Sequence, residues 1–177
     1  MKVLQVPTIE EISNGQAKID SLRPIQIEDL LERDPVPANQ KLLNKSVNNS
    51  CVCITGAGGS IGSALCLHIA SLRPCKLVVL GRGEHSLYSV TRRLSAYSDL
   101  DFDLALVDIQ NLQQLDYTLA LHKPDMVFHA AAYKHVNMLE RFPSQAVLNN
   151  VLGTQNVMRA CQEARVERLV SISTDKA

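Results

Sequence analysis

A glycine-rich turn between a strand-like and a helix-like segment constrains this sequence most. The apolar run Cys51–Thr55 is typical of a buried strand, and a helical pattern begins at Ser60. In this context Gly56 permits a tight turn, Gly59 lets a diphosphate approach the backbone, and Gly62 lets the helix pack closely on the sheet. The turn therefore predicts a dinucleotide site with the phosphates at the amino end of a helix.

Strand-like and helix-like segments alternate through the rest of the chain. Further apolar runs lie at Lys76–Leu80, Leu104–Val107, Met126–Ala130 and Leu169–Ser173. Helical patterns run from Ser60 to about Leu72 and near Glu84–Tyr97, Leu112–Leu121 and Ser144–Ala164. Strands that are apolar throughout indicate a parallel sheet covered by helices on both faces. We predict an α/β fold with a Rossmann-like, doubly wound parallel sheet of about five strands, incomplete because the chain stops soon after the fifth.

The first 49 residues differ from this pattern. They contain four prolines and no glycine motif, and short helical patterns lie around Thr8–Ser13 and Gln26–Glu32. Thr8 and Glu11 have the spacing of a capping box. We predict a connector with short helices over residues 1–49 and an NAD(P)-binding domain over residues 50–177.

Composition argues against several classes of protein. The 177 residues carry 18 Lys and Arg against 18 Asp and Glu, with 3 Phe, 4 Tyr and no Trp, which gives no support for nucleic-acid binding. The cysteines form no CxxC pair and the histidines are scattered, so we predict no metal site and a reducing, cytoplasmic location. No apolar run reaches the roughly 18–20 residues that span a bilayer.

The residues after the second and third strands bear on the choice of cofactor. Gly81 and Arg82 stand where NAD-selective folds place an acidic residue, and a guanidinium suits a 2′-phosphate, so we favour NADP, with NAD as the alternative. Glu84 could still reach a ribose hydroxyl, and Arg82 could be a solvated charge. Asp108 is placed to accept from the adenine amine, and it could also or instead cap the next helix.

Several longer motifs resemble one known family. They are the glycine turn together with Leu80–Tyr88, Phe128–Val136, Asn149–Thr154 and Ser173–Ala177. These segments resemble the polysaccharide-biosynthesis branch of the extended short-chain dehydrogenases/reductases, which contains the UDP-N-acetylglucosamine 4,6-dehydratases. The connector, with Leu22–Pro24 and Ile27–Leu31, is similar to the segment that precedes the catalytic domain of longer, membrane-anchored members.

The resemblance implies a dehydration of a UDP-sugar in surface polysaccharide biosynthesis. In this reaction a hydride is transferred from the sugar to the bound nicotinamide and later returned to the sugar. Carried over by position, Thr174 would hydrogen-bond the C4 oxygen of the sugar, Asp175 would act as general acid toward the C6 hydroxyl, and Lys176 would remove the C5 proton. A strand-to-helix cap is the structural alternative for this segment. The resemblance also implies homo-oligomers of the full-length protein, with any attachment to the inner membrane made by segments outside this sequence.

Small and polar residues after the fourth strand complete the candidate site. The small side chains of Ala130–Ala132 would let the cofactor lie against the backbone. Lys134 is a candidate substrate or cofactor contact, or a solvated lysine. His135 is a lining or packing residue, and Asn149 could reach the site or a backbone kink. The candidate cofactor-binding residues are Gly56, Gly59, Ser60, Ile61, Gly62, Arg82, Asp108, Ala130, Ala131 and Ala132.

One feature of the wider superfamily is absent. No tyrosine here has a lysine four positions later, and the family carries that Tyr-x-x-x-Lys pair on the helix after the fifth strand, beyond Ala177. We therefore expect a fragment that is not active alone. The alternatives to a dehydratase are an NAD(P)-dependent sugar-nucleotide epimerase and a non-catalytic nucleotide-binding module.

Overall fold

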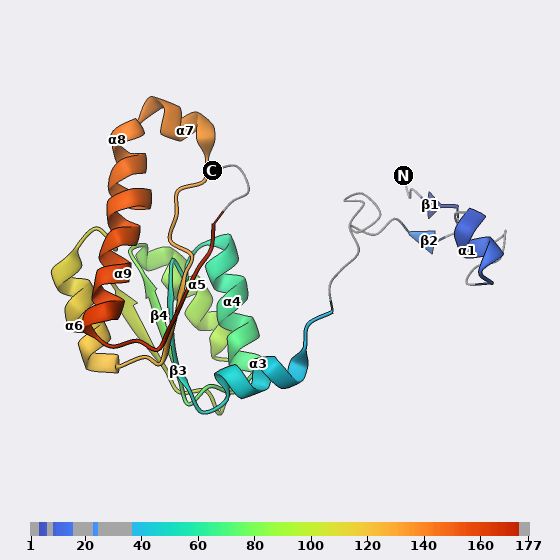
Figure 1. Ribbon diagram of the computed structural model, residues 1–177, viewed down its shortest axis with the longest axis horizontal. Helices are drawn as coiled ribbons and strands as arrows, with labels where there is room; N and C mark the ends of the chain where they lie inside the picture. Colours follow the sequence, from blue (N-terminus) through green and yellow to red (C-terminus); the bar gives the residue numbers. More distant parts are fainter. Residues whose placement is uncertain (1–3, 7–8, 16–22, 25–36, 174–177) are drawn as a thin grey trace. The chain divides into compact units, whose positions relative to one another are not determined.

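The computed structural model describes residues 4–6, 9–15, 23–24 and 37–173, which fall into two units, Met1–Asn39 and Gln40–Ala177 (Figure 1). In the first unit, strands β1 (Leu4–Gln5) and β2 (Arg23–Pro24) pair antiparallel, and α1 spans Ile9–Ser13. The helix confirms the first helical pattern of the connector. Thr8 of the capping box and the second pattern, 26–32, lie outside the described residues.

The second unit is built on one parallel sheet of five strands. They are β3 (Cys51–Thr55), β4 (Lys76–Gly81), β5 (Phe102–Leu106), β6 (Met126–His129) and β7 (Arg168–Ser171). Their order across the sheet is β5-β4-β3-β6-β7, with every neighbouring pair parallel. The chain therefore winds outward from β3 in both directions, which confirms the predicted doubly wound fold.

Helices cover both faces of this sheet (Figure 1). The helices α3, α4 and α5 span Gln40–Val47, Ser60–Ser71 and Glu84–Leu94, while α6 and α9 span Leu112–His122 and Thr154–Glu163. Side chains of β3 alternate between the two faces: Val52 and Ile54 pack with α3, α4 and α5, whereas Cys51 and Cys53 pack with α6 and α9. Both faces are apolar because both are buried.

The cysteines of the strands and helices are free. Cys51 and Cys53 are buried core residues, as their place in an apolar run predicts. Burial raises the pKa of the Cys66 thiol to about 12, so this side chain remains protonated and apolar at neutral pH.

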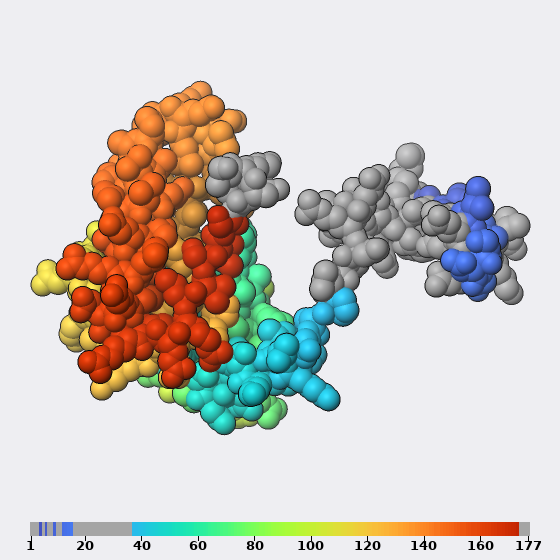
Figure 2. All heavy atoms as spheres, viewed as in Figure 1, coloured from blue at the N-terminus to red at the C-terminus, as the bar shows by residue number. Residues whose placement is uncertain are grey.

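The region after β6 differs most from the sequence-based expectation. A short helix α7 (Val136–Arg141) was not predicted, and the single long helix predicted over Ser144–Ala164 is three segments. These are α8 (Pro143–Ala146), the π-helix η1 (Val147–Gly153) and α9. Figure 2 shows α7 and α8 as an orange surface at one end of the second unit. The π-helix η1 carries Asn149 and Asn150, whose side-chain hydrogen bonds are described below.

Several other boundaries also shift. Helix α5 ends at Leu94, short of the expected Tyr97, and strand β5 begins two residues before Leu104. Helix α3 was not predicted: its Val47 is buried in the core of the second unit, and the carbonyl of Ser46 accepts a hydrogen bond from Arg168 in β7. The division of the chain at residues 49 and 50 stays a prediction.

Four turns that lead from a helix into a strand share one backbone feature. Asn49, Arg73, Lys123 and Arg165 each have a positive φ, between 47° and 58°. They follow α3, α4, α6 and α9, and each directly precedes a segment entering β3, β4, β6 or β7. A left-handed residue ends these helices and turns the chain back toward the sheet.

Candidate functional site

A cleft of about 290 Å³ lies at the carboxyl ends of the central strands. It is lined by the last residue of β4, by the segments that follow β3, β4, β5 and β6, and by one residue each of α5 and η1. The lining residues are Gly56, Gly58, Gly59, Gly81, Arg82, Gly83, Ser86, Val107, Asp108, Ile109, Ala130, Ala131, Ala132, Tyr133 and Asn149. The cleft thus lies where the strand order reverses, the position at which open α/β sheets bind ligands.

The turn after β3 packs directly against the chain that leaves β6. Gly56 has φ +67°, and a Cβ there would lie 2.6 Å from both the Ala130 oxygen and the Ala131 Cα. A Cβ on Gly62 would overlap the carbonyl oxygen of Gly56. Both positions therefore require glycine, the first for its backbone conformation and the close approach, the second for the packing of α4 on the turn.

The amino end of α4 faces the cleft without a side-chain cap. Gly59 is the N-cap residue, it makes no side-chain cap, and a Cβ there would meet only the Gly56 oxygen, at 3.2 Å. Ser60 and Ile61 are exposed in the first turn of α4 and do not line the cleft. Sequence reasoning missed Gly58, where a Cβ would lie 2.6 Å from the Ser86 Cβ. Gly58 therefore lets α5 approach the turn.

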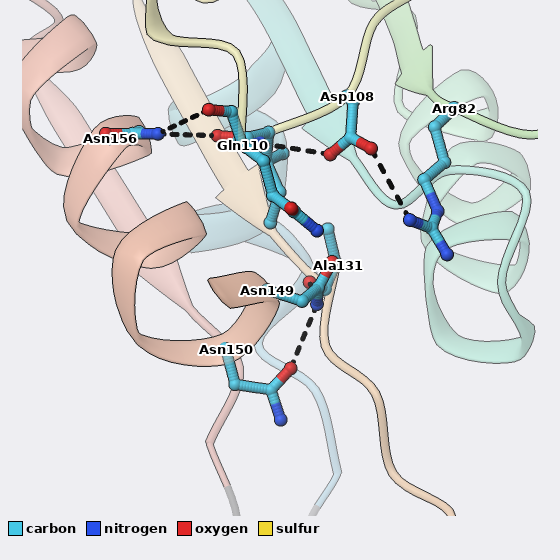
Figure 3. A network of polar contacts seen from close by, with 8 residues as sticks. Arg82, Asp108, Gln110, Ala131, Asn149, Asn150 and Asn156 are labelled. Carbon is cyan, nitrogen blue, oxygen red and sulfur yellow. Dashed lines mark hydrogen bonds and ion pairs between the residues drawn. The ribbon is translucent and has the colours of Figure 1, made fainter. Parts of the chain in front are cut away.

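Arg82 and Asp108 meet at the β4–β5 side of the cleft (Figure 3). Arg82 Nη1 donates to Asp108 Oδ2 at 3.4 Å, and the Arg82 guanidinium carbon lies 4.9 Å from the centroid of the Tyr133 ring. The other carboxylate oxygen of Asp108 accepts the Gln110 N–H at 3.0 Å. A long, exposed ion pair of this kind is weak, so a stronger anion can compete for the guanidinium.

The cap of α6 belongs to a different residue from the one considered in the sequence. The Asn111 Oδ1 accepts the Gln114 N–H at 3.1 Å, so Asn111 and not Asp108 is the N-cap. Asn156 of α9 donates to the carbonyls of Ile109 and Gln110 at 3.1 Å each, as Figure 3 shows. These contacts fix the loop after β5 and leave the assignment of Asp108 to the adenine amine a prediction.

Two consecutive asparagines of η1 hold the chain that leaves β6. Asn149 is buried, and its Nδ2 donates to the Ala131 oxygen at 3.0 Å and to the Asn150 Oδ1 at 2.9 Å (Figure 3). The Asn150 Oδ1 also accepts the Tyr133 N–H at 2.8 Å, while its Nδ2 donates to the Tyr133 oxygen at 2.9 Å. The sequence signal was present, because two adjacent asparagines are poor residues for a helix interior.

A buried histidine of β6 joins β3 to α9. His129, the last residue of β6, hydrogen-bonds through Nδ1 to the Thr55 hydroxyl at 2.7 Å and through Nε2 to the Thr154 hydroxyl at 2.9 Å. Burial lowers the pKa of His129. A neutral imidazole donates one hydrogen bond and accepts the other, so the two threonines complete its polar contacts.

The remaining candidate residues are not assembled in the cleft. Lys134 and His135 are exposed and lie outside its lining, so their substrate contacts stay predictions. Thr174, Asp175 and Lys176 lie outside the described residues. Within the described ranges, no group of three or more His, Cys, Asp or Glu side chains could hold a metal ion. No helix in the same part of the chain is long and apolar enough to cross a bilayer.

The fold and its cleft place the chain in the class of Rossmann-like α/β proteins. Residues 52–177 match the family described as polysaccharide biosynthesis protein, and the chain belongs to that family. The match agrees with the expectation drawn from the sequence motifs.

The names of individual similar proteins state a pathway or an activity. The capsular polysaccharide biosynthesis protein CapD of Staphylococcus aureus is 39% identical over 179 residues, covering 100% of this chain and 30% of CapD. A UDP-N-acetylglucosamine 4,6-dehydratase (inverting) of Campylobacter jejuni is 30% identical over 131 residues, covering 73% of this chain and 38% of the enzyme. The chain thus spans about a third of the length of these curated relatives.

A solved structure of similar fold carries ligands. The UDP-glucose-4-epimerase of Stenotrophomonas maltophila, with bound NAD and formylated UDP-arabinopyranose, matches with a TM-score of 0.66 and 27% identity, over 72% of this chain and 38% of the epimerase. Relatives of the chain therefore include sugar-nucleotide dehydratases and epimerases.

Proposed function

We propose that this chain supplies the cofactor-binding part of a nucleoside-diphosphate-sugar 4,6-dehydratase of the UDP-N-acetylglucosamine type, acting in surface polysaccharide biosynthesis. The observation that carries the proposal is the cleft itself, in which the glycine turn after β3 and the uncapped amino end of α4 lie beside Ala130–Ala132. The similarity to the Campylobacter jejuni dehydratase supports the choice of reaction.

The residues present fit a nicotinamide dinucleotide. The space beside Gly59 and the free amino end of α4 would receive the diphosphate, and the alanines after β6 would leave room for the nicotinamide ribose. Arg82 lies beside Gly83, the uncapped amino end of α5, so guanidinium and helix end would together favour the 2′-phosphate of NADP. NAD remains the alternative, and the similar epimerase structure holds NAD.

When bound, the nicotinamide would take a hydride from C4 of the sugar and return it to C6. By resemblance, Thr174 would hydrogen-bond the C4 oxygen while the C4–O bond becomes a carbonyl, and the C4 hydroxyl proton would pass to the tyrosine of the Tyr-x-x-x-Lys pair that the family carries on the helix after the fifth strand. Lys176 would take the C5 proton, and Asp175 would protonate the departing C6 hydroxyl, which leaves as water. With the hydride at C6 and a proton back at C5, the product is a 4-keto-6-deoxy sugar, and no net oxidation occurs.

The reaction is tested by incubating the full natural chain with UDP-N-acetylglucosamine and either cofactor. We expect a product lighter by one water, detected by mass spectrometry, with a 4-keto group. A C4 epimer of unchanged mass would instead identify an epimerase, the activity named for the Stenotrophomonas maltophila relative. Nucleotide binding without turnover would indicate a non-catalytic module.

The cofactor preference is tested at Arg82. Arg82→Ala in the full natural chain should weaken NADP binding by about tenfold or more, because a charge-assisted phosphate contact of about 1.5–3 kcal/mol is lost, and should leave NAD binding unchanged. Arg92→Ala is the matched control, since Arg92 is exposed near the far end of α5. An unchanged ratio of the two dissociation constants in Arg82→Ala would refute the assignment to the 2′-phosphate.

A further inference from the structure

The ring of Tyr133 contacts Arg82 across the cleft. Arg82 follows β4 and Tyr133 follows β6, and β3 lies between these two strands in the sheet. The 4.9 Å contact therefore joins residues that follow two strands that are not neighbours in the sheet. Tyr133 lies in the Phe128–Val136 motif at the ligand edge of the sheet, where no role was assigned to it from the sequence; in the structure it joins the two sides of the proposed cofactor site.

The geometry of this contact leaves the guanidinium able to bind an anion. The cation–π contact places the guanidinium carbon 4.9 Å from the centroid of the Tyr133 ring, and the N–H donors of the guanidinium lie in the plane of the group. Asp108 accepts from Nη1 at 3.4 Å, which leaves Nε and Nη2 for another acceptor. The Arg82 side chain is 49% exposed, and its contacts with Asp108 and Tyr133 limit its rotamers. A restricted guanidinium loses less conformational entropy when it binds a phosphate.

Tyr133 is itself held by the π-helix. Asn150 bonds both polar groups of the Tyr133 backbone, at 2.8 and 2.9 Å, as a neighbouring strand would. Asn149 adds a bond to the Ala131 oxygen two residues earlier. These contacts continue through the Tyr133 ring to Arg82, so a helix on one side of the cleft constrains a cation on the other.

We propose that Tyr133, fixed by Asn150, is a positioning residue that sets the preference between NADP and NAD by orienting Arg82 toward the 2′-phosphate. This inference rests on the proposed function, in which Arg82 binds that group. Tyr133 need not touch the cofactor for this role, because it acts on the guanidinium.

The test compares NADP and NAD dissociation constants by calorimetry on the full natural chain. Tyr133→Leu keeps an apolar side chain but removes the aromatic face, so NADP affinity should fall about two- to fivefold while NAD affinity stays constant. Tyr133→Phe keeps the ring and should restore the ratio. Tyr88→Leu is the control, since Tyr88 is an exposed tyrosine in α5.

A second variant reaches the same contact from the helix. Asn150→Asp keeps an acceptor for the Tyr133 N–H but loses the donor to the Tyr133 oxygen, so it should shift the ratio in the same direction as Tyr133→Leu. If Tyr133→Leu does not fold, the ratio of the NADP and NAD dissociation constants measured on Asn150→Asp tests the proposal instead.

The outcomes separate the two proposals. If Arg82→Ala lowers the NADP preference and both Tyr133→Leu and Asn150→Asp leave it unchanged, the positioning role is wrong and the proposed cofactor preference stands. An equal loss of NADP and NAD affinity in Tyr133→Leu would mean that Tyr133 only shapes the cleft for both cofactors, which also overturns the inference. If Arg82→Ala leaves the ratio unchanged, the proposed cofactor preference fails first.

Discussion

Replacing Gly56 with alanine tests the close packing at the centre of the cleft. The substitution places a Cβ at a residue with φ +67°, 2.6 Å from the Ala130 oxygen and the Ala131 Cα. The left-handed conformation costs a non-glycine residue about 1–2 kcal/mol. Overlap with the neighbouring chain adds about 1–3 kcal/mol, because both contacted atoms belong to the backbone and cannot rotate away. We expect Gly56→Ala to lower the free energy of unfolding by about 2–5 kcal/mol.

Gly59→Ala is the matched variant in the same turn. Gly59 has φ −77° and ψ 171°, which any residue adopts, and a Cβ there would meet only the Gly56 oxygen at 3.2 Å. Its loss of stability should be about 1 kcal/mol or less, the difference between glycine and alanine at an N-cap. Its added methyl group would instead obstruct a diphosphate. The free energy of NADP binding should therefore be reduced by more than the free energy of unfolding.

Urea denaturation followed by circular dichroism measures both variants, and calorimetry with NADP measures binding. The prediction requires that Gly56→Ala loses more stability than Gly59→Ala by at least about 1 kcal/mol. Equal losses would mean that the turn moves freely away from the Ala130–Ala131 backbone. Undiminished nucleotide binding in Gly59→Ala would show that no phosphate passes this position.

Two further predictions concern the polar residues that support the cleft. Burial holds the pKa of His129 below 6.5, so the unfolded chain takes up a proton first as pH falls below 6.5. The contribution of His129 to the free energy of unfolding is therefore fully present above pH 6.5. Below pH 6.5 this contribution declines by at most about 1.4 kcal/mol per pH unit. Urea midpoints across this range should show a shallower decline in His129→Phe, and an identical slope would contradict the reasoning. Asn111→Ala should lower stability by about 1 kcal/mol through loss of the α6 cap, whereas Asn111→Asp should retain it in the same urea assay.

The sheet and the glycine turn could be predicted because their signals are local. Buried parallel strands are continuous apolar runs, and β4 and β6 lie within one residue of the expected bounds. The spacing of Gly56 and Gly62 reflects contacts between neighbouring segments of the turn and α4, which any sequence with this turn must satisfy.

The cross-cleft contacts could not be predicted because they join distant residues. Asn150 bonds a backbone 17 positions away, and Arg82 meets Asp108 26 positions away. Helical periodicity also does not distinguish η1 from the α-helices beside it, since the apolar pattern continues through both. Nor does a sequence show that the Tyr133 ring, rather than the adjacent Lys134 side chain, lines the cleft.

The left-handed residues at the ends of four helices have a consequence for engineering. Asn49, Arg73, Lys123 and Arg165 lie where the strands begin, whereas the cleft lies where the strands end. Glycine at any of these four turns would remove the strain of the left-handed conformation. Its greater conformational freedom in the unfolded chain would cancel part of that gain, so the free energy of unfolding should rise by up to roughly 1 kcal/mol for each substitution. Glycine already occupies the opposite edge, where the proposed cofactor would need it. Stability can therefore be raised at the edge where the strands begin, away from the residues that line the cleft.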